Sequence, residues 1–420
     1  MGRVHVIGAG LAGLAAAVRL AGHGVAVVLH EAAGHAGGRC RSFHDHQLDR
    51  RIDNGNHLML SGNSAVQTYQ ETIGAVDTMS GPERAEFPFI DLADGTRWTV
   101  RPDRGAIPWS VFRSHRRVPG THASDYLKAW KLVRAGKTDT LGDCLATEGA
   151  LWRRFWHPIA VSILNTDPAK ASAQLLWAVI AETFGKGEAA CRPLIAKQGL
   201  SESLIDPAVR YVQNHDGEVR LNDRVRGLSM ETGKVVGLTA SEEIRLKSDD
   251  KVVMALPPTG ARGLLPDIDG PDAFQAIVNG HFMVEQALDD HTFMGVVGGT
   301  AEWIFVRGDV VSVTVSAADR LAEKPEAEIA QILWADIRRV FDIKSEQPGP
   351  YRIIKEKRAT FAQTPAQVAR RPECETVLKN LFLAGDWTDT DLPATIEGAL
   401  RSGFHAADKA LETIKNVERP

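Results

Sequence analysis

The chain has 420 residues, of which 44% are apolar and 24% charged, and its formal net charge is −4. This length predicts two or three domains, and the charge gives no reason to expect nucleic-acid binding. No run of eighteen apolar residues predicts a membrane span, and four widely separated cysteines predict reduced thiols in a cytoplasmic protein.

The first predicted elements are a strand, a glycine-rich turn, a helix and a second strand. The strand covers Arg3–Ile7, the turn Gly8–Gly13, the helix Leu14–Ala21 and the second strand Val25–His30. Glu31 ends the second strand, about twenty residues after the turn begins. This order of elements is the context in which a G-x-G-x-x-G motif predicts a dinucleotide site.

Each residue of the motif has a physical task in holding a dinucleotide. Gly8 permits the tight turn, Gly10 lets the backbone approach a pyrophosphate, and Gly13 lets helix and strand pack closely. The helix N-terminus adds free N–H groups and the positive end of the helix dipole. Glu31 is placed to accept hydrogen bonds from ribose hydroxyls, and its charge would repel the 2′-phosphate of NADP. NAD and FAD both remain compatible with this segment.

The Gly37–Arg39 run that follows Glu31 favours FAD. A second glycine pair that brings an arginine to the diphosphate is typical of FAD proteins that resemble the amine-oxidase and phytoene-desaturase group. Simple NAD dehydrogenases lack it. No cysteine or histidine stands in a pattern for covalent flavin attachment, so we expect non-covalent FAD, and no metal site is expected.

The central part of the chain predicts further pieces of the nucleotide-binding fold separated by two inserts. Residues 217–225 indicate a strand, a turn and a strand, and residues 250–258 indicate an apolar strand stopped by a proline pair. Residues 105–197 have helical patterning and carry five tryptophans. Between residues 275 and 360, strand-like runs such as Trp303–Val306 and Val310–Val315 alternate with one amphipathic helix, Pro325–Phe341.

The C-terminal elements repeat the order of a strand followed by a glycine. A strand that ends at Gly385 and Asp386 brings a carboxylate to the ribityl chain or its phosphate. The Pro393–Gly398 stretch then starts a helix that extends from about Ala394 to Thr413. Its positive dipole end can point at the flavin pyrimidine ring, where it would stabilise negative charge on the reduced flavin.

Further segments resemble one subgroup of the FAD-dependent amine-oxidase superfamily. They are Ile52–His57, Leu164–Thr166, Arg192–Leu194 with Gly199–Leu204, and Ala384–Thr388. With the motifs above, they resemble the squalene-associated FAD-dependent enzymes, the hydroxysqualene dehydroxylases of bacterial hopanoid synthesis. Asn56 stands where that family has a glutamine in its D-N-G-Q-H segment, which leaves the contact of this side chain open.

The resemblance implies an α/β fold in which a Rossmann-like FAD-binding domain of the amine-oxidase type joins a mixed α+β substrate domain with a helical insert. The FAD-binding domain is expected to be discontinuous and to comprise residues 1–65, 198–260 and 375–420. Residues 66–197 and 261–374 are expected to form the substrate domain over the flavin.

The resemblance also implies positions around the cofactor. The diphosphate would be lined by Gly8, Gly10, Leu11, Ala12 and Gly13 and flanked by Gly38 and Arg39, while Glu31 would hold the ribose. The other contacts would be Gly55, Asn56 and His57 at the flavin face, the Val225 backbone at adenine, Gly385 and Asp386 at the ribityl phosphate, and Thr395 and Ile396 at the flavin O2 edge.

The implied activity replaces the allylic hydroxyl group of hydroxysqualene by hydrogen and gives squalene. This chemistry needs a proton donor for the oxygen, a dry pocket that stabilises a cation, and a hydride from reduced flavin. The tryptophans of the insert can supply that pocket or can simply pack their helices. His57, His281 and Glu397 are the candidate donors. His57 is favoured by its place after Gly55, but it can instead form only a hydrogen bond with the backbone. Glu397 can have a structural role at the start of a helix.

The sequence leaves two alternative activities open, and also two partners, a membrane surface and the reductant of the flavin. A carotenoid-type desaturase would use the same cofactor motifs on a similarly long isoprenoid. An amine oxidase is weakened because the strand predicted at Ala276–Met283 has no lysine for the flavin N5. Trp109–Arg117 combines aromatic and cationic residues, which fits either peripheral contact with an anionic membrane or a solvated basic helix. The reductant of the flavin is unknown.

Overall fold

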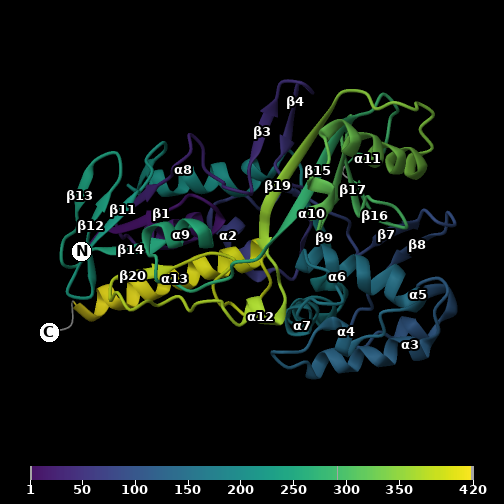
Figure 1. Ribbon diagram of the computed structural model, residues 1–420, viewed down its shortest axis with the longest axis horizontal. Helices are drawn as coiled ribbons and strands as arrows, with labels where there is room; N and C mark the ends of the chain where they lie inside the picture. The colour runs from purple at the N-terminus through teal and green to yellow at the C-terminus, as the bar shows by residue number, and fades with distance from the viewer. Residues whose placement is uncertain (1, 291, 418–420) are drawn as a thin grey trace.

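A parallel five-stranded sheet lies at the end of the molecule where the two chain termini meet (Figure 1). The computed structural model describes residues 2–290 and 292–417. In spatial order the strands are β10 (Glu218–Arg220), β2 (Val27–His30), β1 (Val4–Ile7), β14 (Lys251–Met254) and β20 (Leu381–Leu383). Strands β1, β2, β14 and β20 are buried along their whole length, as expected for a parallel sheet covered on both faces.

Helices from both ends of the chain cover one face of this sheet. They are α1 (Leu11–Gly22), α2 (Ser64–Thr72), α8 (Asp206–Asn214) and α13 (Ile396–Val417), and they share one apolar cluster with β1 and β2. Helices α1 and α13 pack side by side, and a Cβ on Gly403 would lie only 2.1 Å from the Ala12 carbonyl oxygen. Arg19 and Asp408 form an ion pair of 2.6 Å between them. The first and last helices therefore form one unit.

The opposite face packs against a small antiparallel sheet and a short helix, namely β11 (Gly227–Glu231), β12 (Lys234–Thr239), β13 (Glu243–Arg245) and α9 (Pro258–Leu264). The second strand expected within residues 217–225 is wrong, because only β10 forms there. Asn222 has a φ of 56°, and the Asp223 carboxylate bonds to His30 and Ser241, so the extended backbone ends at Arg220.

The other part of the molecule is built on a seven-stranded sheet. In spatial order its strands are β19 (Tyr351–Phe361), β15 (Phe274–Met283), β18 (Val310–Val315), β17 (Trp303–Arg307), β16 (Thr292–Val297), β7 (Phe87–Asp91) and β8 (Arg97–Val100). Helix α11 (Glu326–Phe341) covers one face with Ile329, Leu333 and Ile337, which recur at helical spacing. It begins one residue after the predicted start at Pro325, which is its N-cap, and ends at Phe341 as predicted.

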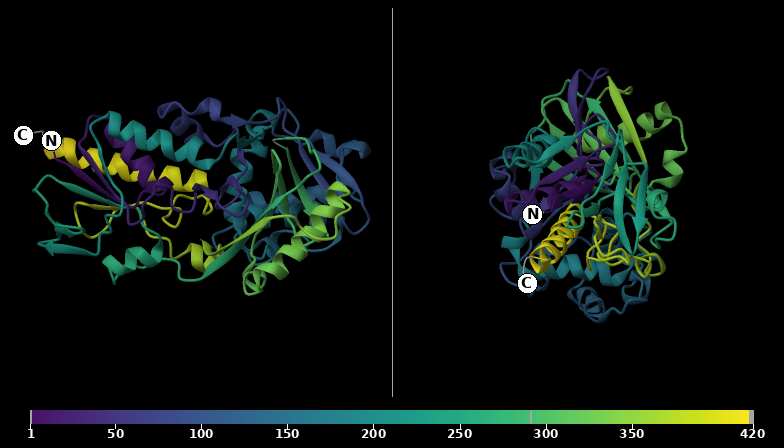
Figure 2. Two further views of the ribbon diagram at one scale, coloured as in Figure 1. Left: turned by 90° about the horizontal axis from the view of Figure 1, so that it is seen from above. Right: turned by 90° about the vertical axis from the view of Figure 1, so that its left-hand side faces the viewer.

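The expected helical insert forms the end of the molecule farthest from the termini (Figures 1 and 2). Its helices are α3 (Ala123–Leu127), α4 (Leu141–Cys144), α5 (Gly149–Leu151), α6 (His157–Leu164) and α7 (Ala173–Glu182). Asn165, the left-handed cap of α6, fastens the insert to the large sheet. Its Nδ2 donates to Thr360 Oγ1 at 2.9 Å, and its Oδ1 accepts from the Ala317 N–H at 2.7 Å.

Short elements connect the two sheets. They include the hairpin of β3 (Ser42–Asp45) and β4 (Arg50–Asp53), and the small sheet of β5 (Met59–Leu60), β9 (Pro193–Ala196) and β6 (Met79–Ser80), with α10 (Asp319–Ala322) and α12 (Pro365–Val368) beside the large sheet. Over the part of the chain that the structure describes, no helix combines the length and the apolar character needed to cross a membrane.

Candidate cofactor and substrate site

The turn between β1 and α1 has the form of a dinucleotide cradle. Gly8 has a φ of 101°, and a Cβ on Gly13 would lie 1.8 Å from the Gly8 carbonyl oxygen, so both positions require glycine. A Cβ on Gly10 would meet no protein atom within 4 Å. The N–H groups of Ala12 and Gly13 have no acceptor among the described residues and lie at the positive end of α1. This arrangement fits a pyrophosphate.

Glu31 and Val225 lie where the ribose and the base of such a ligand would follow. The Glu31 carboxylate accepts the N–H groups of Ala9 and Ala33, both at 2.8 Å, which fixes it beside the turn. Each carboxylate oxygen of Glu31 can accept one further hydrogen bond. The Asp223 N–H donates to the Glu31 carbonyl at 2.7 Å and brings the next residues alongside. The backbone of Val225 has no hydrogen-bond partner within the described ranges, which suits contact with a base.

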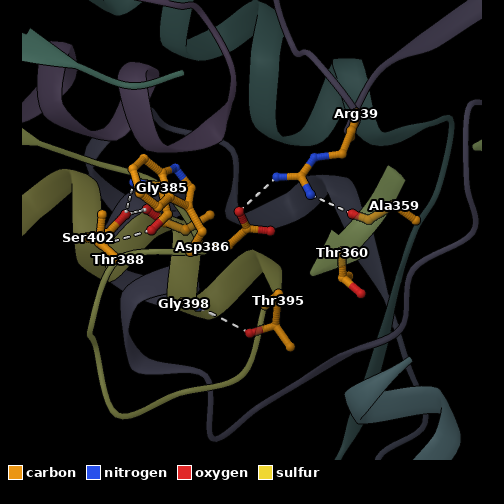
Figure 3. Close-up of polar contacts among 12 residues, drawn as sticks. Arg39, Ala359, Thr360, Gly385, Asp386, Thr388, Thr395, Gly398 and Ser402 are labelled. Carbon is orange, nitrogen blue, oxygen red and sulfur yellow. Dashed lines mark hydrogen bonds and ion pairs between the residues drawn. The ribbon is translucent and has the colours of Figure 1, made fainter. Parts of the chain in front are cut away.

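The second glycine turn brings an arginine to the same place. A Cβ on Gly38 would lie 3.4 Å from the Gly10 Cα, so the two turns are in contact. Arg39 Nη2 donates to Asp386 Oδ1 at 2.8 Å, and Arg39 Nη1 donates to the Ala359 carbonyl (Figure 3). The Asp386 carboxylate raises the pKa of Arg39, which stays charged. Two residues that the sequence assigns to the phosphates thus meet although 347 positions separate them.

Arg371, which was not among the predicted site residues, holds the loop after β20 in place. The Gly385 N–H donates to Ser402 Oγ at 2.8 Å, which ties the loop to α13 (Figure 3). The buried Arg371 donates to the carbonyls of Asp386 and Thr388. A single arginine in a connecting segment carries no pattern from which this role could be predicted.

Thr395 and Ile396 form the start of α13. Thr395 Oγ1 accepts the Gly398 N–H at 3.1 Å, as a helix cap does (Figure 3). Ile396 packs against the apolar cluster around α1. Figure 3 shows Thr395 near Asp386, and the Gly385–Ser402 hydrogen bond ties the loop before Asp386 to the same helix. The positive dipole end of α13 is thus available to a ligand beside the Arg39–Asp386 pair.

Glu397 is bound entirely to protein groups. Its carboxylate accepts the N–H groups of Ala65 and Val66, both at 3.0 Å, and so caps the start of α2. It also accepts from Arg401 Nε at 2.8 Å. This geometry agrees with the structural role that the sequence left open for Glu397.

A chain of amide and hydroxyl groups holds residues 54–57 against the large sheet. Asn279 Nδ2 donates to the Asn54 carbonyl at 3.3 Å, Thr314 Oγ1 donates to Asn279 Oδ1 at 2.8 Å, and Asn56 Nδ2 donates to Thr314 Oγ1 at 3.1 Å. A Cβ on Gly55 would lie 3.3 Å from Asn279 Nδ2. The Asn56 side chain therefore reaches Thr314, although the family has the longer glutamine at this position. The signal for Asn279 was a polar residue in the largely apolar run 276–283, which also contains His281.

The two candidate histidines have different surroundings. His57 is partly buried and has no hydrogen-bond partner among the described residues, and its burial lowers its pKa while Asp53 opposes that shift. His281 is fully buried in β15, with Nδ1 2.8 Å from Ser312 Oγ and Nε2 without a partner in the described part of the chain. Burial lowers the pKa of His281 to about 4, so it is neutral at pH 7.

The sheet face next to this segment is aromatic. We define the aromatic face as the set formed by Phe87, Phe89, Trp98, Phe293, Trp303 and Phe305, which share one apolar cluster. Phe89 stacks on Trp98 and meets the edge of Trp303, each with 5.4 Å between ring centroids. Trp303 lies opposite Thr314 in the strand register, so the aromatic face adjoins residues 54–57. The Trp303 indole N–H is buried without an acceptor among the described residues.

The tryptophans of the helical insert lie elsewhere. Trp156 is buried in the apolar core of the insert, and Trp109 and Trp130 point outward into solvent. The aromatic side chains next to residues 54–57 therefore come mainly from the large sheet, and individual insert tryptophans pack their own helices or remain exposed.

The family of the chain follows from comparison with known proteins. The model of the family described as "Flavin containing amine oxidoreductase" matches residues 11–411. A hydroxysqualene dehydroxylase of Rhodopseudomonas palustris is 46% identical over 410 residues, which cover 97% of this chain and 98% of that protein. A probable zeta-carotene desaturase of Synechococcus elongatus is 24% identical over 98% of both chains. The chain belongs to the flavin-containing amine oxidoreductase family, and within it to the hydroxysqualene dehydroxylases.

Comparison with solved structures confirms the α/β fold class. A putative protoporphyrinogen oxidase from an Exiguobacterium species superposes with a TM-score of 0.68 over 98% of this chain and 99% of its own, at 17% sequence identity. This likeness concerns the fold. Membership of the flavin-containing amine oxidoreductase family makes the chain a flavin-dependent oxidoreductase with FAD as its cofactor, and the cradle described above fits that dinucleotide.

Proposed function

We propose that this protein replaces the allylic hydroxyl group of hydroxysqualene by hydrogen and thereby forms squalene. The observation that carries the proposal is the junction of residues 54–57 with the aromatic face at Thr314 and Trp303. Polar groups there lie beside aromatic side chains. The polar groups can bind the single hydroxyl group of the substrate, and the aromatic side chains can contact its long hydrocarbon chain. Membership of the hydroxysqualene dehydroxylases supports this substrate.

The proposed FAD contacts are those expected from the sequence. They are Gly8, Gly10, Leu11, Ala12, Gly13, Gly38 and Arg39 at the diphosphate, Glu31 and the Val225 backbone at the adenosine, Gly385 and Asp386 at the ribityl phosphate, and Gly55, Asn56, His57, Thr395 and Ile396 at the flavin ring. When bound in its reduced form, FAD supplies a hydride to the substrate carbon.

The aromatic face is proposed to stabilise the allylic cation that forms when the C–O bond breaks. The faces of aromatic rings attract cations, and their apolar surface keeps out water that would trap the cation. The Trp303 N–H needs an acceptor, and a substrate hydroxyl group would supply one. The overall change consumes one hydride and one proton and releases water, so an external donor must reduce the flavin after each turnover.

His57 is proposed to give the proton to the departing oxygen. It follows Gly55 in the segment beside the aromatic face, and its ring has no competing partner among the described residues. Its lowered pKa makes the protonated ring a stronger acid that is less populated at neutral pH. His281 stays a second candidate, although its protonated form is scarce at pH 7. For Glu397 we propose the structural role that its contacts support.

One experiment tests the reaction. The FAD-loaded protein is reduced without oxygen and incubated with hydroxysqualene, and the lipid extract is analysed by mass spectrometry. We expect squalene in an amount equal to the flavin oxidised. A polyene formed by oxidised enzyme, with no squalene from reduced enzyme, would establish a desaturase instead.

We also propose the division into an FAD-binding domain of residues 1–65, 198–260 and 375–420 and a substrate domain of residues 66–197 and 261–374. The origin of the five-strand sheet from these three segments supports it, whereas α2 (Ser64–Thr72), which packs on that sheet, crosses the boundary after residue 65 and moves it to the end of this helix. A cytoplasmic location is proposed as well, since Cys40, Cys144, Cys191 and Cys374 are all buried and unpaired.

A further inference from the structure

The helical insert exposes a dense group of apolar side chains. Among the described residues, ten large apolar side chains are exposed, and six of these lie between residues 107 and 133. They are Ile107, Trp109, Phe112, Leu127, Trp130 and Val133, each more than half exposed. Such a concentration within one short segment is unusual on a soluble surface and marks an interaction site.

The same segment is strongly cationic. Residues 104–137 contain eight lysines and arginines and a single acidic residue, Asp125, in a chain whose net charge is −4. Arg113, Lys128 and Lys131 are exposed. Within the part of the chain that the structure describes, none of the eight cations forms an ion pair with a carboxylate. The segment therefore presents uncompensated positive charge beside its apolar side chains.

The elements that carry these side chains are neighbours. The 3₁₀ turn η2 (Trp109–Phe112) contacts α3, and α3 continues directly into the 3₁₀ segment η4 (Lys128–Arg134). Segment η4 is amphipathic, because Leu132 is buried in the core of the insert while Trp130 is exposed. The insert forms the end of the molecule farthest from the termini, where a flat partner can reach it (Figure 1).

We propose that residues 107–134 dock this protein on the surface of an anionic lipid bilayer. Tryptophan and phenylalanine rings insert at the headgroup level, and lysine and arginine bind anionic headgroups. A second copy of the chain fits poorly, because a symmetric contact would bring two cationic segments together. The aliphatic Ile107, Leu127 and Val133 add nothing to base stacking, so a nucleic acid fits less well than lipid.

Docking at this end would shorten the path of a lipid substrate to the aromatic face, a use that rests on the proposed function. Trp98 and Val100 contact both the core of the insert and the aromatic cluster, so apolar side chains continue from one to the other. Leu58 and Leu60, which follow His57, belong to the same aromatic cluster. A substrate drawn from the bilayer would remain among apolar groups.

Vesicle sedimentation of the FAD-loaded protein tests the docking without the reaction. One set of vesicles is phosphatidylcholine alone, and the other contains phosphatidylglycerol as well. We expect binding to the anionic set that weakens with salt. The variants W109S/F112S/W130S and R113Q/K128Q/K131Q should each lower the partition coefficient about tenfold or more. The matched control M230S/V377S changes exposed apolar residues outside this segment and should bind as the wild type does.

The outcomes separate the docking from the reaction. Flavin content and turnover of detergent-solubilised hydroxysqualene should be unchanged in both triple variants, whereas turnover of vesicle-embedded substrate should fall. Equal vesicle binding by wild type and variants would overturn the proposal. So would a wild-type dimer in light scattering that dissociates in W109S/F112S/W130S while vesicle binding is absent. Vesicle binding without any dehydroxylation would support the docking and refute the proposed function.

Discussion

At the scale of single residues, Gly10 and Gly13 have opposite surroundings within one turn. A side chain at Gly13 would collide with the Gly8 carbonyl, whereas a side chain at Gly10 would project into open space. We therefore expect Gly10→Val to fold normally and to lose FAD, because its side chain would occupy the place of the pyrophosphate. Flavin absorbance per protein and thermal unfolding measure the two effects. Gly13→Ala, as control, should lower the unfolding temperature, and a Gly10→Val protein with a full complement of FAD would show that the diphosphate lies elsewhere.

The pKa of His57 gives its proposed role a testable pH dependence. Burial places this pKa below 6.5, so the protonated ring becomes rarer as the pH rises from 6.5 to 8.5. If the protonated ring supplies the proton, the single-turnover rate should fall about tenfold for each pH unit across that range. His57→Ala should keep its FAD, lose about 10²–10⁴-fold in rate, and show a flat profile. An unchanged rate in fully flavin-loaded His57→Ala would exclude His57 from the chemistry.

Residue patterns predicted the cofactor loops better than the substrate side. The glycine turn and Glu31 lie within one short segment, so a local motif is enough to predict their backbone geometry, which the structure confirms. The network of Asn54, Asn279 and Thr314 joins three distant segments. Its one local signal was Asn279, a polar residue in the largely apolar run 276–283, which does not tell which residues it bonds to. Arg371 acts through carbonyl groups, which every residue has, so no sequence signal exists for it.

At the scale of secondary structure, Glu397 links two helices. Its carboxylate caps α2 from the first turn of α13, and this contact explains why a buried acid stands at a helix start. Glu397→Ala would leave the N–H groups of Ala65 and Val66 and the Arg401 side chain without this acceptor. We expect a loss of about 2 kcal/mol or more in the free energy of unfolding, measured in urea. The rate per bound flavin should stay within about twofold, as a structural role requires. A stable variant with a large loss of rate would return Glu397 to the catalytic candidates.

Elements with a clear apolar period were predictable, and short irregular ones were not. The helix α11 and the strand β18 (Val310–Val315) agree with the predicted segments closely, because each has one buried face along its whole length. Residues 109–116 form two 3₁₀ turns in place of a helix, since their apolar side chains have no core to cover. The apolar run 155–165 starts within a π-helical turn, Trp152–Trp156, which no periodicity specifies.

At the scale of the whole molecule, a row of buried side chains, His5 of β1, His30 of β2 and Asp223, predicts that acid lowers the stability of the protein. His5 Nδ1 lies 3.0 Å from His30 Nε2, and His30 Nδ1 lies 2.7 Å from Asp223 Oδ2. Burial lowers the pKa of His5 to about 4 and also lowers that of His30, so the unfolded chain binds protons below pH 6.5 that the native protein does not. The pKa of Asp223 is lowered to about 2, so its stabilising contribution persists until the pH falls below 3.8.

The free energy of unfolding should therefore fall by about 2 kcal/mol for His5 alone between pH 7 and pH 5. Urea unfolding at the two pH values measures the loss. His5→Gln should reduce it, because the side chain no longer takes up a proton on unfolding. His23→Gln changes an exposed histidine of the same end of the molecule and should leave the loss as in the wild type. Equal losses in all three proteins would show that His5 does not control acid unfolding.

The pairing of α1 with α13 has a consequence for how the protein is made. The two members of the Arg19–Asp408 ion pair are 389 positions apart, so a ribosome completes α1 long before its partner helix exists. Until then the side of α1 that packs against α13 stays uncovered, although β1, β2 and α8 can already cover its other sides, and exposed apolar surface of this kind favours aggregation. A chain that stops before Leu381 carries the whole glycine turn yet lacks β20, Asp386 and α13. We therefore expect a chain truncated before Leu381 to bind no FAD, which flavin absorbance of the purified fragment would measure.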